Sequence, residues 1–541
     1  MSFATHLTDE RIADMTGSGQ WRGRTLLDYL ADAAHRHPDK VAVTGPDGHG
    51  RTVRLSYLEL DELSRHVAAG LIRLGVGKGD VVSMQLPNWV EFFLIHLGCL
   101  RLGAVTNPLM PFLRHRELTF MLGLAESKVV IVPREFRGFD YPAMIAELRA
   151  DLPKLAHCIV VGGEGPASFD AALLNAPEAP LPADALSPND VIEILYTSGT
   201  TGEPKGVMQI SNTLFSALPD MCDRLRLASD DVVLMSSPLA HQTGFIYGMM
   251  ISIMLGAKCV LQDIWNAEIA ARLIAAEGVT FTMASTPFLA DLTEEAGRGR
   301  ADLTTLRIFL AAGAPLPRAL VHTASEKLGA HILSGWGMTE TELVTVTSPD
   351  DAEDLVVNTD GRAFKTMAVR VVDEQGRELP ADTEGRLQVR GAGNFVGYLK
   401  RPELYSMDAE GWFDTGDLAR MDAAGYIRIT GRSKDIIIRG GENIPVAEIE
   451  NILFAHPAVR EIAIVGVPDP RLGERACAFV TLKEGQSLSF DDMVNHLNSR
   501  RIAKSYLPER LEVVTELPRT ASGKIQKFIL RDLARCLPDT P

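Results

Sequence analysis

The sequence has few cysteines, and it has no long apolar run. Six cysteines are scattered through 541 residues without a Cys-x-x-Cys pair. Neither a metal cluster nor a disulfide framework is therefore expected, and a reducing cytoplasm fits. The longest apolar run, Phe245–Ala257, is shorter than the ~20 residues that span a bilayer and predicts a buried helix. The polar N-terminus lacks the apolar core of a signal peptide. We expect a cytoplasmic protein without a transmembrane segment.

An excess of positive charge is also absent. The chain has 54 basic and 70 acidic side chains, and its net charge is −16. This balance argues against nucleic acid or an anionic membrane as the main partner. Any site for a phosphate-bearing ligand must therefore be a local positive field. The length is too great for one hydrophobic core and predicts two or more domains.

One stretch concentrates groups that bind anions. After the apolar run Val191–Tyr196, residues 197–207 read Thr-Ser-Gly-Thr-Thr-Gly-Glu-Pro-Lys-Gly-Val. Glycines let backbone N–H groups turn toward an anion, hydroxyls add donors, and Lys205 adds a point charge. The Walker pattern does not fit, because Lys205 follows a proline and precedes a glycine. The stretch predicts a triphosphate-binding loop, and a plain surface turn is the alternative.

The pattern of apolar residues predicts an α/β fold. Helical and strand-like segments alternate from Thr25 to about Ser334, which predicts two helix-covered sheets of parallel type. They include a helix over Tyr57–Leu74 that stops at Gly75 and strands at Val232–Met235 and Lys258–Leu261. Beyond Glu340, short β-rich segments between Gly, Asp and Pro turns predict a small β-barrel or antiparallel sheet. A compact α+β unit of roughly 110 residues follows, enough for an independent domain. We predict an N-terminal domain over 1–432 and a C-terminal domain over 433–541.

The loop resembles the phosphate-binding signature of the adenylate-forming superfamily, which includes acyl-CoA synthetases, luciferases and the adenylation domains of peptide synthetases. Five further segments resemble this family in the expected order, and together they cover nearly the whole chain: Ala311–Pro317, Gly335–Glu340, Trp412–Asp417, Gly431–Ile436 and Pro518–Lys527. The chain looks closest to bacterial short- and medium-chain acyl-CoA synthetases and cyclohexanecarboxylate-CoA ligases. The resemblance implies a large N-terminal domain and a small mobile C-terminal domain.

The resemblance also implies an ATP site assembled from several loops. An aromatic ring between glycines can lie against a purine, and a carboxylate near phosphates can hold Mg²⁺. Trp336 stands where family members usually have tyrosine. Thr339 is expected at the α-phosphate, Glu340 at the metal, Asp417 on the ribose, and Arg432 on the ribose or a phosphate. The implied ATP-binding residues are Thr197, Ser198, Gly199, Thr200, Thr201, Gly202, Lys205, Gly313, Ala314, Pro315, Trp336, Gly337, Met338, Thr339, Asp417, Arg432 and Lys524.

The same resemblance implies a set of catalytic residues, including a lysine, and a moving domain. A lysine on a glycine-containing loop can be swung in as a compact cation, and Lys524 is expected to bridge the substrate carboxylate and the α-phosphate. The C-terminal domain is then expected to rotate about a hinge at Lys434 and bring the CoA-binding residues over the site. Those residues are Arg439, Gly440, Gly441 and Glu442. The implied catalytic residues are Lys524, Thr339, Glu340 and His241.

The segment Pro238–Phe245 resembles the family's acyl-pocket segment. His241 lies near the position where amino-acid-activating domains place an aspartate for the substrate amine, and the lack of that aspartate argues against an amino acid. A lone histidine is more often structural; here we predict that His241 gates the substrate. The implied acyl pocket is apolar, although such residues also form cores by default: His241, Phe245, Gly335, Trp336 and Met338.

We therefore expect an acyl-CoA synthetase that uses ATP, Mg²⁺ and coenzyme A. It would convert a short- or medium-chain fatty acid, or a cyclohexanecarboxylate-like acid, to acyl-AMP and then to the CoA thioester. Such transfers depend mainly on positioning and charge neutralisation. A fatty acyl-AMP ligase that loads a carrier protein, an aryl-CoA ligase, a luciferase-like oxygenase and a non-enzymatic nucleotide-binding protein are the alternatives. A homodimer is left open.

Overall fold

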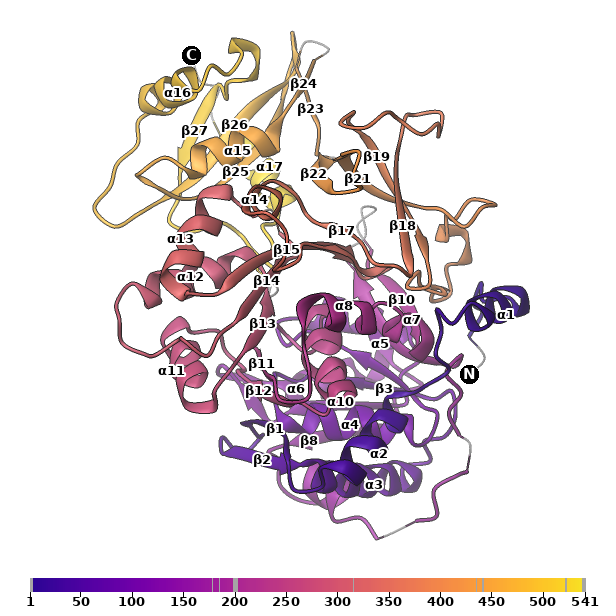
Figure 1. The fold of residues 1–541 in the computed structure, drawn as a ribbon. Helices are drawn as coiled ribbons and strands as arrows, with labels where there is room; N and C mark the ends of the chain where they lie inside the picture. The colour runs from indigo at the N-terminus through magenta and orange to yellow at the C-terminus, as the bar shows by residue number, and fades with distance from the viewer. Residues whose placement is uncertain are drawn as a thin grey trace.

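The computed structural model describes residues 3–177, 179–183, 185–197, 203–314, 316–433, 435–439, 442–520 and 523–537. Two large sheets with helices packed around them form most of the molecule, and two smaller β-rich units lie at one end of it, in orange and yellow in Figure 1. The predicted α/β fold with a smaller C-terminal α+β unit is confirmed. Among the described residues, no helix is long and apolar enough to cross a membrane.

The first large sheet has seven strands and contains both arms of the predicted phosphate loop. Strands β9, β4, β3, β5 and β8 are parallel, while β10 and β20 are antiparallel additions at one edge. All residues of β3 are buried, as expected for parallel strands covered on both faces. The order is β20(Gly397–Tyr398), β10(Lys205–Ile210), β9(Val191–Thr197), β4(Val105–Pro108), β3(Val81–Met84), β5(Val129–Pro133) and β8(His157–Val161).

The second large sheet has nine strands, with a parallel centre and antiparallel edges. Its parallel strands run from β15 to β1, so the segments that follow β14 and β15 emerge side by side. The order is β17(Arg362–Ala363), β16(Glu342–Val346), β15(His331–Met338), β14(Ile308–Ala312), β13(Phe281–Ala284), β11(Val232–Met235), β12(Lys258–Leu261), β1(Val41–Pro46) and β2(Thr52–Ser56).

The helices around these sheets begin at clear N-terminal signals. Thr25 and Asp28 form a capping box at α2, and Ser56 and Glu59 form another at α3. The chain turns at Gly75 (φ 76°) just beyond α3, which agrees with the predicted end of that helix. The helices are α1(Asp9–Gly17), α2(Leu26–Arg36), α3(Tyr57–Arg73), α4(Val90–Leu100), α5(His115–Leu124), α6(Tyr141–Leu148), α7(Ser211–Phe215), α8(Leu218–Leu225), α9(Gln242–Gly244), α10(Ile251–Leu255), α11(Ala267–Glu277), α12(Thr286–Ala296), α13(Arg318–Leu328) and α14(Glu353–Asn358).

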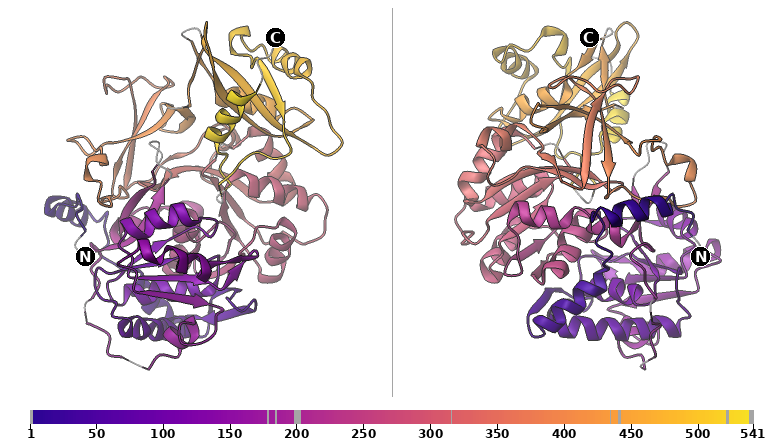
Figure 2. Two further views of the ribbon diagram at one scale, coloured as in Figure 1. Left: turned by 180° about the vertical axis from the view of Figure 1, so that it is seen from behind. Right: turned by 45° about the vertical axis from the view of Figure 1, so that its right-hand side comes forward.

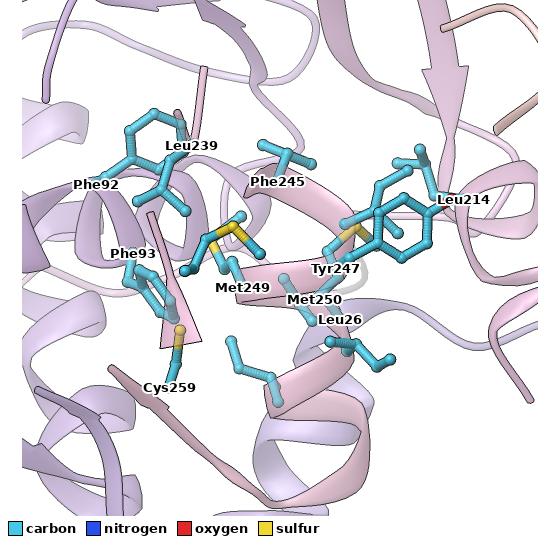
Figure 3. Packing of buried hydrophobic residues seen from close by; sticks show 14 of the residues in the cluster. Leu26, Phe92, Phe93, Leu214, Leu239, Phe245, Tyr247, Met249, Met250 and Cys259 are labelled. Carbon is cyan, nitrogen blue, oxygen red and sulfur yellow. The ribbon is translucent and has the colours of Figure 1, made fainter. Parts of the chain in front are cut away.

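The largest core cluster fills the space between the sheets. Its centre includes Phe92 and Phe93 of α4 and Met249 of a π-helical segment, η3(Phe245–Met250) (Figure 3). That segment lies between α9 and α10, where the sequence predicts one continuous buried helix. All six residues of η3 are buried, so burial on every side replaces the amphipathic pattern of a surface helix.

Of the two predicted alternatives, a small β-barrel or an antiparallel sheet, the structure has a four-stranded antiparallel sheet: β18(Met367–Val372), β19(Gly385–Gly391), β21(Phe413–Met421) and β22(Ile427–Arg432). Its strand order is linear within the described residues, since four short strands do not close a barrel. The C-terminal unit has its own apolar core. It comprises β23(Ile437–Arg439), β24(Glu442–Ile444), α15(Val446–Phe454), β25(Val459–Asp469), β26(Gly473–Leu482), α16(Phe490–Ser499), β27(Arg510–Val513) and α17(Lys527–Cys536).

Candidate active site

The two arms of the predicted phosphate loop form an antiparallel hairpin. Thr197 ends β9 and pairs in register with Lys205, which begins β10. The residues at the tip, Ser198, Gly199, Thr200, Thr201 and Gly202, lie outside the described residues. The Lys205 ammonium lies 5.0 Å from the centroid of the Tyr398 ring on the neighbouring strand β20. The hairpin therefore presents a cation beside an aromatic ring that the sequence did not single out.

The turn after β14 emerges beside the glycine-rich end of β15. Ala312 and Gly335 are register partners on these parallel strands, so Gly313 and Ala314 continue next to Trp336. Gly313 has φ 83°, a conformation that favours glycine. The predicted adenine-binding segments Gly313–Ala314 and Gly335–Trp336 therefore lie side by side. Pro315, which is also predicted to contribute, lies outside the described residues.

A tight hairpin turns the chain between β15 and β16. A Cβ added at Gly337 would lie 2.0 Å from the carbonyl oxygen of Glu342, so only glycine fits there. Glu342 itself has φ 60°, which is uncommon for a residue with a side chain. Met338 packs against a small apolar cluster that includes Tyr398 and Phe395. The hairpin places Thr339 and Glu340 at its tip, between the two large sheets.

Trp336, Asp417 and Arg432 form one hydrogen-bonded group. The indole N–H of Trp336 donates to Asp417 Oδ2 at 2.9 Å, and Arg432 Nε lies 2.9 Å from Asp417 Oδ1. Asp417 and Arg432 are register partners on β21 and β22. Asp417 is 4% exposed and keeps a lone pair on each oxygen after these contacts. It can therefore still accept hydrogen bonds from two hydroxyl groups of a sugar.

Glu340 is buried behind the same group. Tyr398 donates its hydroxyl to Glu340 Oε1 at 2.8 Å, and burial raises the pKa of Glu340, while the charges of Lys205 and Arg432 oppose this shift. No group of three or more histidine, cysteine or acidic residues is arranged for a metal ion in the described part of the chain. A single carboxylate suits Mg²⁺ when nucleotide phosphates and water supply the remaining ligands.

Lys524 reaches this site from the C-terminal unit. Thr520 N–H donates to the carbonyl oxygen of Lys524 at 2.8 Å, and Lys524 N–H donates to Thr520 Oγ1 at 3.0 Å. Gly523 has φ 83°, and an added Cβ would lie 2.5 Å from Ser285 Oγ, just before α12. The loop is thus docked on the N-terminal domain. In Figure 2 the yellow C-terminal segment extends down to the pink part of that domain. The glycine of the loop allows that close approach.

The electrostatic surroundings of Lys524 join the predicted residues into one site. Burial lowers the pKa of Lys524 to about 8, and the positive charge of Arg432 lowers it further, whereas Asp417, Glu340 and Asp435 act in the opposite direction. Lys524 nevertheless keeps more than a third of its accessible surface. Water therefore screens part of these effects.

His241 faces the same site. Its Nδ1 accepts a hydrogen bond from Thr243 N–H at 3.1 Å, which caps α9. Burial lowers the pKa of His241 to about 4, and the charge of Lys524 lowers it as well. The imidazole is therefore neutral near pH 7, and its proton is on Nε2 because Nδ1 is the acceptor. Nε2–H remains a hydrogen-bond donor for a ligand.

Of the predicted CoA-binding residues, Arg439 makes its contacts away from this group. Arg439 on β23 pairs with Glu509 at 2.5 Å and donates to the Ser505 carbonyl at 3.1 Å, within the C-terminal unit. Glu442 begins β24, and the hairpin β23–β24 lies far from β15 in Figure 1. Gly440, Gly441 and the predicted hinge Lys434 lie outside the described residues. The structure thus has Lys524 at the site and the β23–β24 hairpin away from it.

Several buried polar residues at the site are missed by sequence reasoning. Tyr398, Gln209 and Glu342 come from separate segments without a recognised motif, and Gln242 lies in the segment Pro238–Phe245 but was not singled out there. Glu193 gives the one detectable signal, since it interrupts the otherwise apolar run Val191–Tyr196. A carboxylate in the middle of a buried strand requires an explanation.

Comparison with known proteins gives the family. The model for the AMP-binding enzyme family matches residues 30–399, and the model for the AMP-binding enzyme C-terminal domain matches residues 448–524. A medium-chain fatty-acid–CoA ligase of Escherichia coli (strain K12) is 38% identical over 99% of this chain and 95% of its own.

Two solved structures have the same fold. An anthranilate CoA ligase, AuaEII, in complex with anthranoyl-AMP has a TM-score of 0.86 at 27% identity, covering 95% of this chain and 98% of its own. ATP-bound MatB from Rhodopseudomonas palustris has a TM-score of 0.83 at 29% identity, covering 95% and 99%. This chain belongs to the AMP-binding enzyme family, and it is an AMP-forming acid–thiol ligase that uses ATP, Mg²⁺ and coenzyme A.

Proposed function

We propose that the protein joins a compact, mostly apolar monocarboxylate to coenzyme A by way of an acyl-AMP. A short- or medium-chain fatty acid or an alicyclic acid of similar size is the proposed substrate. The observation that carries this proposal is the convergence of Lys524, Arg432 and the carboxylates of Glu340 and Asp417. Charges of both signs meet there beside a neutral histidine.

Adenylation needs a carboxylate oxygen to approach the α-phosphate, although both are anionic. Lys524 and Arg432 would offset this repulsion, and Lys205 with the loop amides would hold the β- and γ-phosphates. Glu340 would hold Mg²⁺, which neutralises phosphate charge when bound. Asp417 would fix the ribose, and Trp336 would lie against the adenine. Each group acts by position and charge, so no nucleophilic side chain is required.

Thioester formation needs a different face of the C-terminal unit. We propose that residues 433–541 rotate as one domain about Lys434 after adenylation. This movement would withdraw Lys524 and bring Arg439, Gly440, Gly441 and Glu442 over the acyl-AMP. The present separation of the β23–β24 hairpin from β15 supports the need for such a step.

The proposed acyl pocket lies between the segment around His241 and the end of β15. His241 would donate Nε2–H toward the substrate side, and Gly335, Trp336 and Met338 would form a wall. Phe245 has no accessible surface and packs edge-on against His96 at 4.7 Å. Its contribution to the pocket would therefore be support from behind rather than direct contact.

An aromatic acid is the second candidate substrate. The fold similarity to an anthranilate CoA ligase supports it, since that enzyme was solved in complex with anthranoyl-AMP. A flat six-membered ring and a cyclohexane ring differ little in size, so a pocket for one can admit the other. The acid panel below separates the two.

The test is pyrophosphate release with ATP and Mg²⁺ across aliphatic, alicyclic and aromatic acids, each with and without CoA. We expect release with a compact acid, increased by CoA and accompanied by thioester. Release without thioester would move the proposal to an acyl-AMP ligase that loads a carrier protein. Silence with every acid would contradict the proposed substrate class. A catalytically impaired Glu340→Gln variant measures the background.

A further inference from the structure

Four buried polar side chains lie behind the reacting end of the site. Glu193 is on β9, Gln209 on β10, Gln242 at the start of α9 and Glu342 on β16. Their exposed fractions are 0%, 0%, 5% and 4%. Among the described residues, no lysine, arginine or histidine forms an ion pair with either glutamate. Two carboxyl groups are thus buried without a cation.

The hydrogen bonds within this group leave three oxygen atoms without a partner. Gln242 Nε2 donates to Glu193 Oε2 and to Glu342 Oε1, both at 3.2 Å. Gln209 Nε2 donates to Glu342 Oε1 at 2.6 Å. In the described part of the chain, no donor reaches Glu193 Oε1, Glu342 Oε2 or the amide oxygen Gln242 Oε1. The amide oxygen matters most here, because a glutamine cannot satisfy it by changing its protonation state.

The group borders the place where the acid reacts. Gln242 directly follows His241, and Gln209 Nε2 also donates to the carbonyl oxygen of Thr339 at 2.9 Å. The family resemblance implies that Thr339 contacts the α-phosphate, and the proposed function has His241 donate a hydrogen bond toward the substrate. The polar group is therefore joined to both residues, by the chain at His241 and by a hydrogen bond at Thr339.

The chemistry of the group disfavours a purely apolar neighbour. Burial raises the pKa of Glu193 to about 8. A buried polar atom without a partner destabilises its surroundings, and an apolar ligand leaves it in that state. A ligand with an O–H or N–H group removes the defect.

We propose that Glu193, Gln242 and Glu342 form a polar floor of the acyl pocket and bind a hydrogen-bond donor on the acyl part of the substrate. The inference rests on the proposed function and narrows its substrate class. The acid is compact and mostly apolar, and it bears one hydroxyl or amino group away from the carboxylate. Two carboxyl groups can accept from either, and a protonated amine would also neutralise them.

The first test uses the unmodified protein and matched acids. Cyclohexanecarboxylate is compared with its 3- and 4-hydroxy and 3- and 4-amino derivatives, and hexanoate with 6-hydroxy- and 6-aminohexanoate. We expect kcat/KM for pyrophosphate release to be about tenfold or more higher for at least one donor-bearing acid than for its parent. A higher kcat/KM in the hydroxyl series indicates that the site binds a neutral donor, and a higher kcat/KM in the amino series indicates a cationic donor. Equal or lower values for every derivative would overturn the inference.

The second test locates the preference. Glu193→Leu and Gln242→Leu remove the polar atoms with little change in volume, and Gln388→Leu is the matched control, a buried glutamine on β19 that is 9% exposed. We expect both site variants to reduce the ratio of kcat/KM between the donor-bearing acid and its parent by about tenfold. The control should leave that ratio unchanged.

A purely structural role would give a different pattern. If the polar group only holds the fold together, the site variants will lower activity with both acids and leave the ratio unchanged, which overturns the inference. Activity with unsubstituted acids and no donor preference overturns it as well but leaves the ligase intact. Silence with every acid overturns the proposed substrate class and this inference together.

Discussion

Lys524 is the residue whose removal separates the two half-reactions most clearly. It is held on a loop whose glycine packs against Ser285, and its ammonium acts together with Arg432, Asp417 and Glu340. The Lys524→Ala change removes one charge from the site where a carboxylate must approach a phosphate. We expect the variant to lose adenylation and to keep thioester formation from supplied acyl-AMP.

The size of the loss follows from the setting of the charge. Two unit charges about 4 Å apart attract by about 4 kcal/mol at an effective dielectric constant of about 20, and by about 1 kcal/mol in water. Lys524 is surrounded by protein but keeps more than a third of its surface, so an intermediate value applies. About 2.7 kcal/mol corresponds to a loss of about 10²-fold in rate.

The assay measures each half-reaction separately. Acid-dependent pyrophosphate release reports adenylation, and thioester formation from synthetic acyl-AMP and CoA reports the second step. Lys527→Ala is the matched control, since Lys527 lies three positions away and pairs with Glu450 at 2.7 Å, outside the site. We expect this control to change neither rate more than about threefold, the scale of a surface ion pair. An equal loss of both half-reactions in Lys524→Ala would refute the assignment.

Four further predictions follow from the same geometry. Asp417→Asn should raise the KM for ATP about tenfold, because the ribose loses a charged acceptor; ATP saturation curves measure it. Gly523→Ala should slow adenylation about fivefold and spare the thioester step, because φ 83° disfavours a side chain and its Cβ would crowd Ser285; the half-reaction assays measure it. Because the pKa of Lys524 is lowered to about 8, its cationic fraction falls as pH rises through that value, and the adenylation rate should fall with it. The Lys524→Arg variant should keep its adenylation rate over this pH range, and pH–rate profiles of both proteins measure the difference. The pKa of Glu193 is about 8 in the folded state, above its unfolded value, so the folded state retains a proton that the unfolded state releases. The unmodified protein therefore loses stability as pH rises from 5 to 8. The Tm of Glu193→Gln should rise relative to that of the unmodified protein over this pH range.

Each of these predictions has a contradicting result. An unchanged KM for ATP in Asp417→Asn would remove the ribose role. Equal effects of Gly523→Ala on both half-reactions would show that the loop does not act through domain docking. A pH profile of Lys524→Arg that matches the unmodified enzyme would assign the decline to another group. A pH-independent Tm difference for Glu193→Gln would mean that Glu193 does not carry the extra proton.

Elements with clear boundaries in the sequence are predicted well. The strands Val232–Met235 and Lys258–Leu261 coincide with their predicted ranges, because each is a short apolar run with polar residues or glycine beside it. The helix from Tyr57 is also found, since its apolar stripe and the following glycine both mark it. Local chemistry decides these cases, so a single sequence suffices.

Other features depend on contacts that a sequence does not display. The segment Phe245–Met250 is apolar at nearly every position, so its pattern cannot separate a π-helix from an α-helix. The polar group of Glu193, Gln209, Gln242 and Glu342 comes from four distant segments, and the sheets alone bring them together. The motif residues at the site were found because each lies in a sequence segment that resembles the family. Glu193, Gln209 and Glu342 lie outside those segments, and Gln242 lies inside one but has no role assigned there.

The central claim is that one protein makes an acyl-AMP and then transfers the acyl group to CoA. A single-turnover experiment tests this most directly. Enzyme, ATP, Mg²⁺ and the best acid are mixed without CoA, and CoA is added later. Samples quenched before and after the addition of CoA are examined by mass spectrometry. We expect acyl-AMP to accumulate on the enzyme and then to disappear as acyl-CoA and AMP form in equal amounts. Formation of ADP with an acyl phosphate, or acyl-AMP that persists after CoA is added, would contradict the account.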